Sequence, residues 1–313
     1  MISLIICTYN REKYIGEMLE CVAANHFPRK RFEIILVDNN STDSTKAICE
    51  AFSQKHKDLD FKYFLENKQG LSYARNRGIR EANGDVIVFL DDDAFVEDHY
   101  LQNLETKLNE YPDAAAFGGR IDPLFESGKA PDWLCKWNLS WVSAIDKGNS
   151  VCLFKDKYPI GANMGFRKST LDKCGLFSTQ LGRRGKNLMG GEEKDLFLRV
   201  SRAGFNIYYF PDVRVQHVIP ESRTTKSYII KFAQGIGMSE YVRCNAEGGS
   251  SLIKRRFAEI VKWGASIILW IKYLLIGRPA CGNSLLLFRW HVSRSLFTNS
   301  QTTASSGQLS SRP

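Results

Sequence analysis

The chain has 313 residues, of which 43% are hydrophobic and 25% charged, and this globular composition excludes a disordered or collagen-like protein. Its eight cysteines are too few for a disulfide scaffold and include no C-x-x-C spacing, so we expect reduced thiols in a cytosolic setting and no zinc ribbon. The net charge of +9 is unevenly distributed: residues 1–225 hold 31 basic and 31 acidic groups, whereas residues 226–313 hold 12 basic and 3 acidic groups. This excess predicts an anionic partner for the C-terminal part of the chain.

The first 90 residues alternate short apolar runs with amphipathic stretches. The runs predict strands over 2–7, 33–37, 61–65 and 86–90, and the stretches predict helices over about 14–25, 44–55 and 72–83. The first run is too short and lacks the basic start of a signal peptide, so we expect it to begin the fold. The alternation predicts an α/β fold with a mostly parallel sheet and helices on both faces. Ligands of such sheets bind beyond the carboxyl ends of the strands, so residues that follow each strand are candidates for the site.

Three consecutive carboxylates, Asp91, Asp92 and Asp93, follow the fully apolar run 86–90. Side chains two residues apart point the same way in an extended segment, so Asp91 and Asp93 are expected on one side. Their mutual repulsion is tolerable if a hard divalent cation, Mg²⁺ or Mn²⁺, is held there together with a diphosphate. A solvated acidic turn is the alternative interpretation.

Two earlier strand ends carry polar groups that suit a nucleotide. The segment from Asp38 to Asp43 includes Asn40 and follows the second strand; Asp38 can accept a hydrogen bond from a base or ribose, while Ser41 or Thr42 can cap the next helix. Thr8, Tyr9, Asn10 and Arg11 follow the first strand. The sequence has no G-x-G-x-x-G and no P-loop, so neither a dinucleotide site nor a P-loop site is indicated.

The middle of the chain, about 120–158, predicts a long loop or small subdomain over the site, in which Trp133, Trp137 and Trp141 offer flat apolar faces. Order is expected to return at 158–166. A helix near 192–203, short strands at 206–210 and 213–217, and helices from about 225 are expected to follow.

Two adjacent acids, Glu192 and Glu193, follow Gly190-Gly191 at the start of the predicted helix. The helix dipole alone could explain one of them, but the pair also suits a general base that faces a substrate hydroxyl. His217 lies in a strand-like alternation; a lone histidine is usually structural, yet beside a metal it is a reasonable third ligand.

The rear of the chain carries an apolar run, 263–276, that is interrupted by Lys272 and preceded by Lys262. A membrane-spanning helix needs about 20 apolar residues, so this run predicts a helix that lies in the membrane interface with Trp263, Trp270 and Tyr273 at headgroup depth. Five arginines would add attraction to anionic lipid, namely Arg255, Arg256, Arg278, Arg289 and Arg294. A helix packed on the catalytic body is the alternative, and nucleic acid is not expected because long aliphatic runs separate the basic residues.

The motifs, taken in order, resemble the family 2 glycosyltransferases of the GT-A fold over roughly the first 225 residues. The segments that carry the resemblance are 5–11, 35–43, 67–76 with Gly70 and Arg75, 84–86, 91–93, 161–164, 191–199 and His217.

This resemblance implies an inverting transfer from a nucleotide sugar, usually UDP-linked, to a glycan or lipid-linked acceptor. It implies that Asp38 binds the base, that Thr8, Tyr9 and Arg11 line the nucleotide pocket, and that Asp91 and Asp93 hold the metal and the diphosphate. The pair Glu192–Glu193 stands where the family commonly has Glu-Asp, so the catalytic base is Glu193 or Glu192. The Q-x-x-R-W motif of processive synthases is absent, which favours a single addition in each encounter.

We therefore expect three regions: a catalytic domain over 1–225, a basic amphipathic helical region over 226–298 at the membrane surface, and a disordered tail over 299–313. Nucleotide-sugar binding is assigned to the residues after the strands together with Asn10, Asn40, Gly70, Arg75, Asp91 and Asp92, and metal binding to Asp91, Asp93 and His217. The expected location is cytoplasmic, peripheral to the inner face of the cell membrane, in the synthesis of surface polysaccharide or glycolipid. A metal-dependent phosphatase-type hydrolase and a non-catalytic sugar-binding protein are the competing interpretations.

Overall fold

The computed structural model describes residues 1–155, 157–183 and 190–298; the predicted tail over 299–313 lies outside them. The strands are β1 (Ile2–Thr8), β2 (Phe32–Asp38), β3 (Phe61–Leu65), β4 (Val86–Asp91), β5 (Ala94–Val96), β6 (Ala114–Phe125), β7 (Cys152–Leu153), β8 (Met164–Arg167) and β9 (Asn206–Ile219). The helices are α1 (Ile15–Ala23), α2 (Thr45–Lys55), α3 (Leu71–Glu81), α4 (Tyr100–Glu110), α5 (Lys168–Cys174), α6 (Glu192–Arg202), α7 (Lys226–Ala246), α8 (Gly249–Leu275) and α9 (Pro279–Phe297).

One sheet runs through the molecule in the order β3-β2-β1-β4-β8-β6-β9-β5, with β7 paired to β9. The first four strands are parallel, as the sequence predicts, and their registers place Thr8 opposite Asp38 and Cys7 opposite Asp91. The polar residues that end these strands therefore gather at one edge. The other half of the sheet is mixed, since β8 is antiparallel to β4 and β6 whereas β6 and β9 are parallel.

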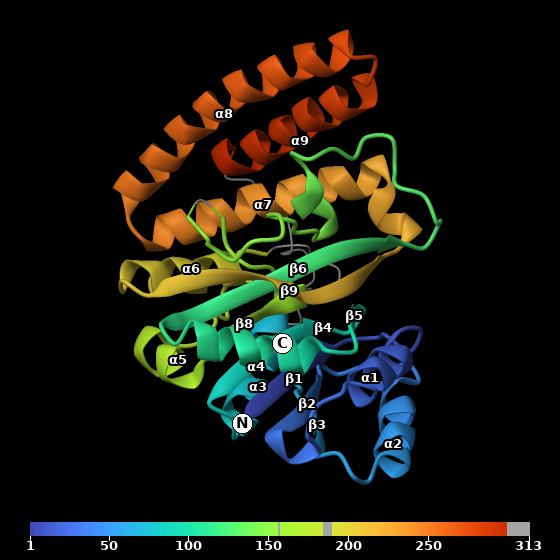
Figure 1. Cartoon of the computed structure of the whole chain (residues 1–313). Helices are drawn as coiled ribbons and strands as arrows, with labels where there is room; N and C mark the ends of the chain where they lie inside the picture. Colours follow the sequence, from blue (N-terminus) through green and yellow to red (C-terminus); the bar gives the residue numbers. More distant parts are fainter. Residues whose placement is uncertain (156, 184–189, 299–313) are drawn as a thin grey trace, which may run out of the picture.

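Helices cover both faces of the sheet, as predicted (Figure 1). On one face α1, α2 and α4 bury apolar residues such as Leu19, Phe52 and Leu104 against the outward side chains of β1 and β2. On the other face α3 and α6 contribute Ala74 and Phe197 to a second cluster. Residues 2–6 of β1 and all of β2 are buried, which explains their nearly continuous apolar sequence.

The predicted strands 206–210 and 213–217 are a single strand, β9, so the predicted break between them is wrong. The register against β6 shifts between Gly119 and Arg120, and this bulge accommodates Pro211 without ending the strand. Gly119 permits the close approach, because a Cβ there would stand 1.8 Å from the Val213 carbonyl oxygen.

Asn163 fastens this bulge to the rest of the sheet. Its side-chain amide donates to the carbonyl oxygens of Arg120 (3.1 Å) and Val213 (2.8 Å), and its carbonyl oxygen accepts from the Tyr100 hydroxyl (2.7 Å). Asn163 and Tyr100 are both buried. The arrangement fixes the part of β9 that leads to His217.

The loop predicted over about 120–158 begins later than expected, because β6 extends to Phe125. Beyond it, Trp133 and Trp141 pack against the C-terminal helices; the Trp141 ring stacks on Phe288 of α9 at 4.2 Å between centroids. The helices α7, α8 and α9 form a layer beyond β6 and β9, with α8 outermost (Figure 1).

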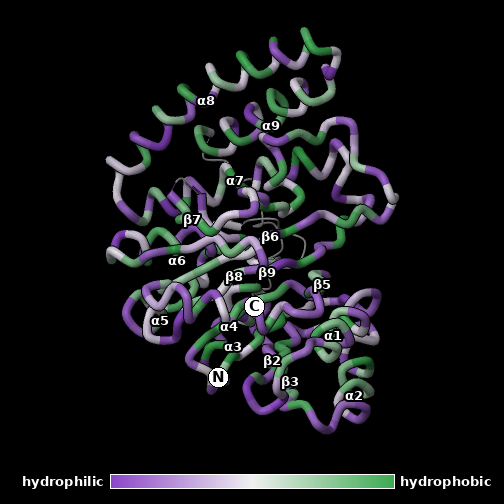
Figure 2. The backbone as a smooth tube through the Cα atoms, in the orientation of Figure 1, coloured by the Kyte–Doolittle hydropathy of each residue, from purple (hydrophilic) through white to green (hydrophobic). Residues whose placement is uncertain are grey.

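Helix α8 presents an apolar face to the outside. Glu259, Ser266 and Tyr273, which are seven residues apart, are its buried residues. Most of its exposed side chains are aliphatic or aromatic, and those at Ile253, Phe257, Ile260, Ile267, Ile271 and Leu274 follow one another at three, four or seven residues. Figure 2 shows hydrophobic segments alternating with hydrophilic ones along this outermost helix. In the described part of the chain, no helix is both long and apolar enough to cross a membrane.

The predicted headgroup face of α8 is wrong. Tyr273 is buried, and the indole nitrogens of Trp263 and Trp270 donate to Ser293 and Asn283 of α9, each at 2.9 Å. The aromatic residues face the protein because they supply packing for α9. Any contact of α8 with lipid must use its aliphatic face instead.

Replacing Asn163 by alanine is expected to lower the free energy of unfolding by about 3 kcal/mol, because it leaves the Tyr100 hydroxyl and the Val213 carbonyl buried and unpaired. Urea titration followed by circular dichroism measures it. Asn103→Ala is the matched control: it also removes an amide-to-carbonyl bond, to Asp212, but at an exposed position, and should cost less than about 1 kcal/mol. Equal losses in the two variants would contradict the fastening role.

Candidate active site

A cavity of about 720 Å³ opens at the carboxyl ends of β1 and β4. Its floor consists of residues 7–11 after β1, 91–93 after β4 and 71–75 at the start of α3. The segment 136–147 and the α6 start at 190–194 form its sides, and Phe232 and Phe288 of the C-terminal helices cover it. The sheet edge that the sequence indicates therefore lines this cavity.

Asp91, Asp93 and His217 meet at one corner of this edge. Asp91 ends β4, Asp93 precedes β5, and β5 pairs with β9 so that Ala94 lies opposite His217. The His217 Nε2 atom lies 3.0 Å from Asp93 Oδ1 and 3.9 Å from Asp91 Oδ2. One ligand atom from each residue falls within 4.8 Å of the others.

The chemistry of this corner fits a divalent cation. Asp93 and His217 are each 1% exposed, and in the described part of the chain none of their side-chain oxygen and nitrogen atoms makes a well-aligned hydrogen bond. Buried polar atoms normally have partners, and two carboxylates with an imidazole form a ligand set that Mn²⁺ accepts. Asp91 is one-third exposed, so it can reach both a cation and a substrate.

Arginines balance the remaining charge of the acidic run. Arg11 contacts Asp92 at 3.2 Å and Asp93 at 3.0 Å, and Arg223 lies 3.9 Å from Asp93. Burial alone would raise the pKa of Asp93, but His217, Arg11 and Arg223 hold it below its ordinary value. Burial raises the pKa of Asp92 to about 7, although Arg11 opposes the shift.

Arg75 holds both acids of the Glu192–Glu193 pair. Its Nη1 atom is 2.9 Å from Glu192 Oε1 and its Nη2 atom is 2.9 Å from Glu193 Oε1, while Nη2 also lies 4.0 Å from Asp91. Glu192 is buried, whereas the Glu193 side chain retains 19% exposure on the cavity. Burial raises the pKa of Glu193 to about 7 despite the attraction of Arg75. Glu193 is thus the more accessible of the two acids.

The structure places the other predicted nucleotide residues unevenly. Thr8, Tyr9, Asn10 and Arg11 line the cavity. Asp38 does not: one of its oxygens accepts from the Ser41 amide and the other from the Tyr63 hydroxyl, each at 2.7 Å. Its neighbour Asn39 lines the cavity instead.

Asn40 and Gly70 also lie outside the lining of the cavity. Asn40 has a positive φ of 70°, and the Gly70 amide donates to Asn39 Oδ1 at 2.7 Å. Both shape the loop that carries Asn39, so their assigned contact with the nucleotide stays a prediction.

Several cationic side chains line the cavity although no sequence pattern indicated them. They are Lys136, Lys147, Lys157, Arg183, Lys194 and Arg223. All but Lys194 come from irregular segments, whose paths have no periodicity from which to predict an inward side chain. Together with Arg11 and Arg75 they make the cavity suited to an anionic substrate.

Comparison with known proteins agrees with this chemistry. The sequence model described as "Glycosyl transferase family 2" matches residues 3–175, more than half of the chain. The chain is 25% identical over 241 residues to the glucosyl-dolichyl phosphate glucuronosyltransferase of Haloferax volcanii, covering 75% of each chain. It is 29% identical over 240 residues to a dolichyl N-acetyl-α-D-glucosaminyl phosphate glucuronosyltransferase of Methanococcus voltae, covering 74% of this chain and 69% of the relative.

Among solved structures, the mannosyltransferase PcManGT of Pyrobaculum calidifontis, in complex with GDP-mannose and Mn²⁺, superposes with a TM-score of 0.61 at 18% identity. The match covers 95% of this chain and 87% of that one. At this identity the likeness shows the fold alone, and it confirms the expected GT-A arrangement, including the presence of helices after the sheet.

Proposed function

Because the chain belongs to glycosyl transferase family 2 and is therefore a glycosyltransferase, we propose that it transfers a sugar, with inversion, from a nucleoside diphosphate sugar to a hydroxyl of a lipid-linked glycan acceptor. The observation that carries this proposal is the joint placement of Asp91 and Glu193 around Arg75 in one cavity. A ligand set for a cation and an accessible carboxylate thus stand within a few ångströms of each other. Family membership favours transfer over the phosphatase-type and non-catalytic interpretations.

The leaving group is handled by the acidic corner and the cations beside it. Asp91, Asp93 and His217 would hold Mn²⁺ or Mg²⁺, which would neutralise charge on the departing diphosphate. Arg11 keeps Asp92 and Asp93 in place at the end of β1. Thr8 and Tyr9 line the cavity where the nucleoside would lie. The family resemblance implies UDP as the usual donor nucleotide.

Glu193 is proposed as the general base. Its carboxylate faces the cavity and would remove the proton of the acceptor hydroxyl as that oxygen attacks the anomeric carbon from the side opposite the diphosphate. A raised pKa strengthens it as a proton acceptor near neutral pH. Glu192 is less exposed and shares Arg75, so it would orient the arginine that positions Glu193.

The acceptor is proposed to be lipid-linked and the enzyme to act at the surface of a membrane, on its cytoplasmic side. Two relatives are named for acceptors on dolichyl phosphate. The outer face of α8 exposes Phe257 at 69%, Ile268 at 68% and Leu275 at 82%, in a helix that is otherwise well packed. Lys254 and Lys272 are also exposed on this helix and suit anionic headgroups. The regions 1–225 and 226–298 would then be the catalytic and the membrane-contacting parts.

Asp93→Asn is expected to lower the affinity for a nucleoside diphosphate at least tenfold in the presence of Mn²⁺, because it removes a charged ligand from the buried corner. Calorimetry with UDP and GDP, with and without Mn²⁺, measures the change. Asp92→Asn is the control, since Asp92 pairs with Arg11 and is not in the ligand set. The metal role is wrong if Mn²⁺ enhances nucleotide binding equally in both variants.

Product release should increase with pH through an apparent pKa near 7, because Glu193 accepts a proton only as the carboxylate and its pKa is raised to about 7. Below that pH the protonated acid cannot act as a base. Glu193→Gln should lower turnover about a hundredfold or more and remove the rising limb, while donor affinity is retained. A pH profile of nucleoside diphosphate release tests this, and Glu192→Gln is the control. Greater loss in the control would assign the base to Glu192.

The double variant Ile260→Asp with Ile268→Asp should abolish flotation with vesicles of phosphatidylglycerol, because it places two charges in the exposed apolar face of α8. These side chains are 62% and 68% exposed, so the fold should be retained. Leu65→Asp with Leu124→Asp is the control, with 48% and 42% exposure on the sheet domain. Continued flotation of the α8 variant would show that this face does not contact lipid.

A further inference from the structure

A second cavity, of about 220 Å³, lies between the start of α6 and the helices α7, α8 and α9. It shares Tyr158, Gly191, Lys194, Ile236 and Phe288 with the lining of the active-site cavity. Gly191 immediately precedes the catalytic pair Glu192–Glu193. The two cavities are therefore neighbours separated by the first turn of α6.

Cationic side chains dominate this second cavity. Among the described residues, Lys194, Arg255, Lys262 and Arg289 line it, and Glu240 is the lining carboxylate. This cationic cavity has room for several water molecules at about 30 Å³ each, and hence for a phosphate group. Burying cations without matching anions is unfavourable, so the excess positive charge calls for an anionic ligand.

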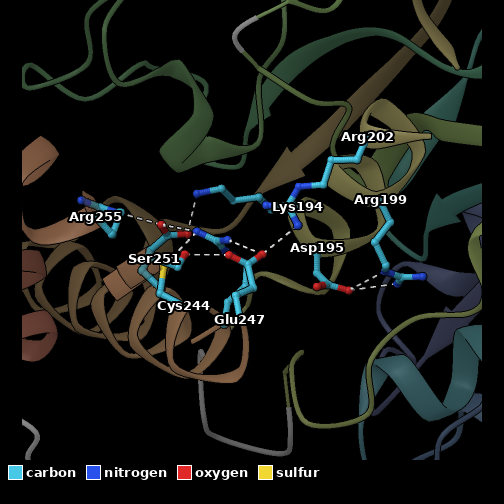
Figure 3. Close-up of polar contacts among 10 residues, drawn as sticks. Lys194, Asp195, Arg199, Arg202, Cys244, Glu247, Ser251 and Arg255 are labelled. Atoms are coloured by element: carbon cyan, nitrogen blue, oxygen red, sulfur yellow. Dashed lines mark hydrogen bonds and ion pairs between the residues drawn. The ribbon is translucent and has the colours of Figure 1, made fainter. Parts of the chain in front are cut away.

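The protein's own acids are already engaged in holding the arginines in place. Glu240 of α7 contacts Lys194 (2.6 Å), Arg243 (3.2 Å) and Arg255 (2.7 Å). Figure 3 shows Lys194 extending from α6 toward the side from which Arg255 of α8 approaches, whereas the Asp195–Arg199 pair lies apart from them. Two cations of the cavity thus share Glu240 with Arg243.

Glu259 of α8 is the second acid that holds cations of the cavity. It is fully buried and pairs with Arg255 (2.7 Å) and Arg289 (3.0 Å). Arg243 also pairs with Glu247 (3.1 Å) and does not line the cavity, so the two carboxylates Glu240 and Glu259 serve the four lining cations if Lys262 is counted. The network positions its arginines rigidly and leaves a surplus of positive charge toward the cavity.

Lys262 is the cation left over. It follows Arg255 and Glu259 by seven and three residues and so shares their face of α8. It makes no ion pair in the part of the chain that the structure describes, although it lines the cavity and is also exposed, which places it at the opening. Partial burial, with Arg255 and Arg289 close by, lowers the pKa of its ammonium group. An anion in the cavity would relieve that repulsion.

We propose that the cationic cavity binds the phosphate group of a lipid-phosphate-linked acceptor and thereby places the acceptor sugar at Glu193. The inference rests on the proposed function and adds the recognition of the acceptor to it. The lipid chain would leave past Lys262 toward the bilayer, while the sugar would pass Tyr158 and Gly191 into the active site. Helix α8 then contributes to both the membrane contact and the acceptor site.

The test uses the full chain and farnesyl phosphate as a soluble lipid phosphate, with binding measured by calorimetry. Lys262→Gln should weaken binding about tenfold or more, since it removes a charge-assisted contact, and Lys262→Arg should retain it. Lys272→Gln, which removes the same charge from the same helix but outside the cavity, should have little effect. Because Lys262 has no ion pair to lose, its variants should melt within a few degrees of the wild type.

Three further probes separate the sources of the phosphate. Farnesol should bind at least tenfold more weakly than farnesyl phosphate, inorganic phosphate should compete with farnesyl phosphate, and Lys262→Gln should leave binding to phosphatidylglycerol vesicles unchanged. The proposal is overturned if farnesol binds as tightly as farnesyl phosphate, or if Lys262→Gln and Lys272→Gln lower the affinity for farnesyl phosphate equally. It is also overturned if Lys262→Gln selectively abolishes vesicle binding, because that result would indicate a site for bulk lipid headgroups. Binding of UDP and GDP with Mn²⁺ is followed in parallel; its absence in the wild type would refute the proposed function without altering the result for farnesyl phosphate.

Discussion

The guanidinium group of Arg75 is the contact on which the arrangement of the site depends. It is buried in α3 and holds Glu192 and Glu193 of α6 and, at greater distance, Asp91 of β4, so residues from two other elements take their positions from one side chain. Burial opposes the charge of Arg75, but Glu193, Glu192 and Asp91 keep its pKa above the ordinary value. A planar fork with two donor edges can hold two carboxylates at once, which a lysine could not do in the same geometry.

The acidic residues of the candidate site are paired with cationic side chains. The acids Asp91, Asp93, Glu192 and Glu193 stand at the sheet edge, and each is contacted by arginine or histidine from another part of the chain. This compensation allows four acids to be crowded into one cavity. Asp93 and His217 nevertheless lack well-aligned hydrogen bonds among the described residues, at the corner where a cation fits.

The C-terminal helices combine a structural role with two proposed contacts. Toward the protein, α8 buries Glu259 and Tyr273 against α7 and α9, and Phe288 of α9 stacks on Trp141 above the active site. Toward the outside, α8 exposes its aliphatic residues. This packing connects the proposed membrane-contacting helix with the proposed general base, since the ion pairs of Glu240 join α6 to α7 and α8.

The sequence by itself determined the parallel half of the sheet, because buried strands and amphipathic helices differ in hydrophobic period. It also indicated Asp91, Asp93 and the pair Glu192–Glu193 as candidate site residues, because acidic residues that directly follow an apolar strand or a double glycine are recognisable from the local sequence. Only the tertiary structure decided which face of α8 is buried, that Asn39 rather than Asp38 lines the cavity, and that Arg75 joins both glutamates. Arg75 and the two glutamates are more than a hundred positions apart, the buried face of α8 depends on its contacts with α9, and the direction of Asn39 depends on the loop that follows β2. Contacts between elements and side chains in loops leave no periodic signal in the sequence.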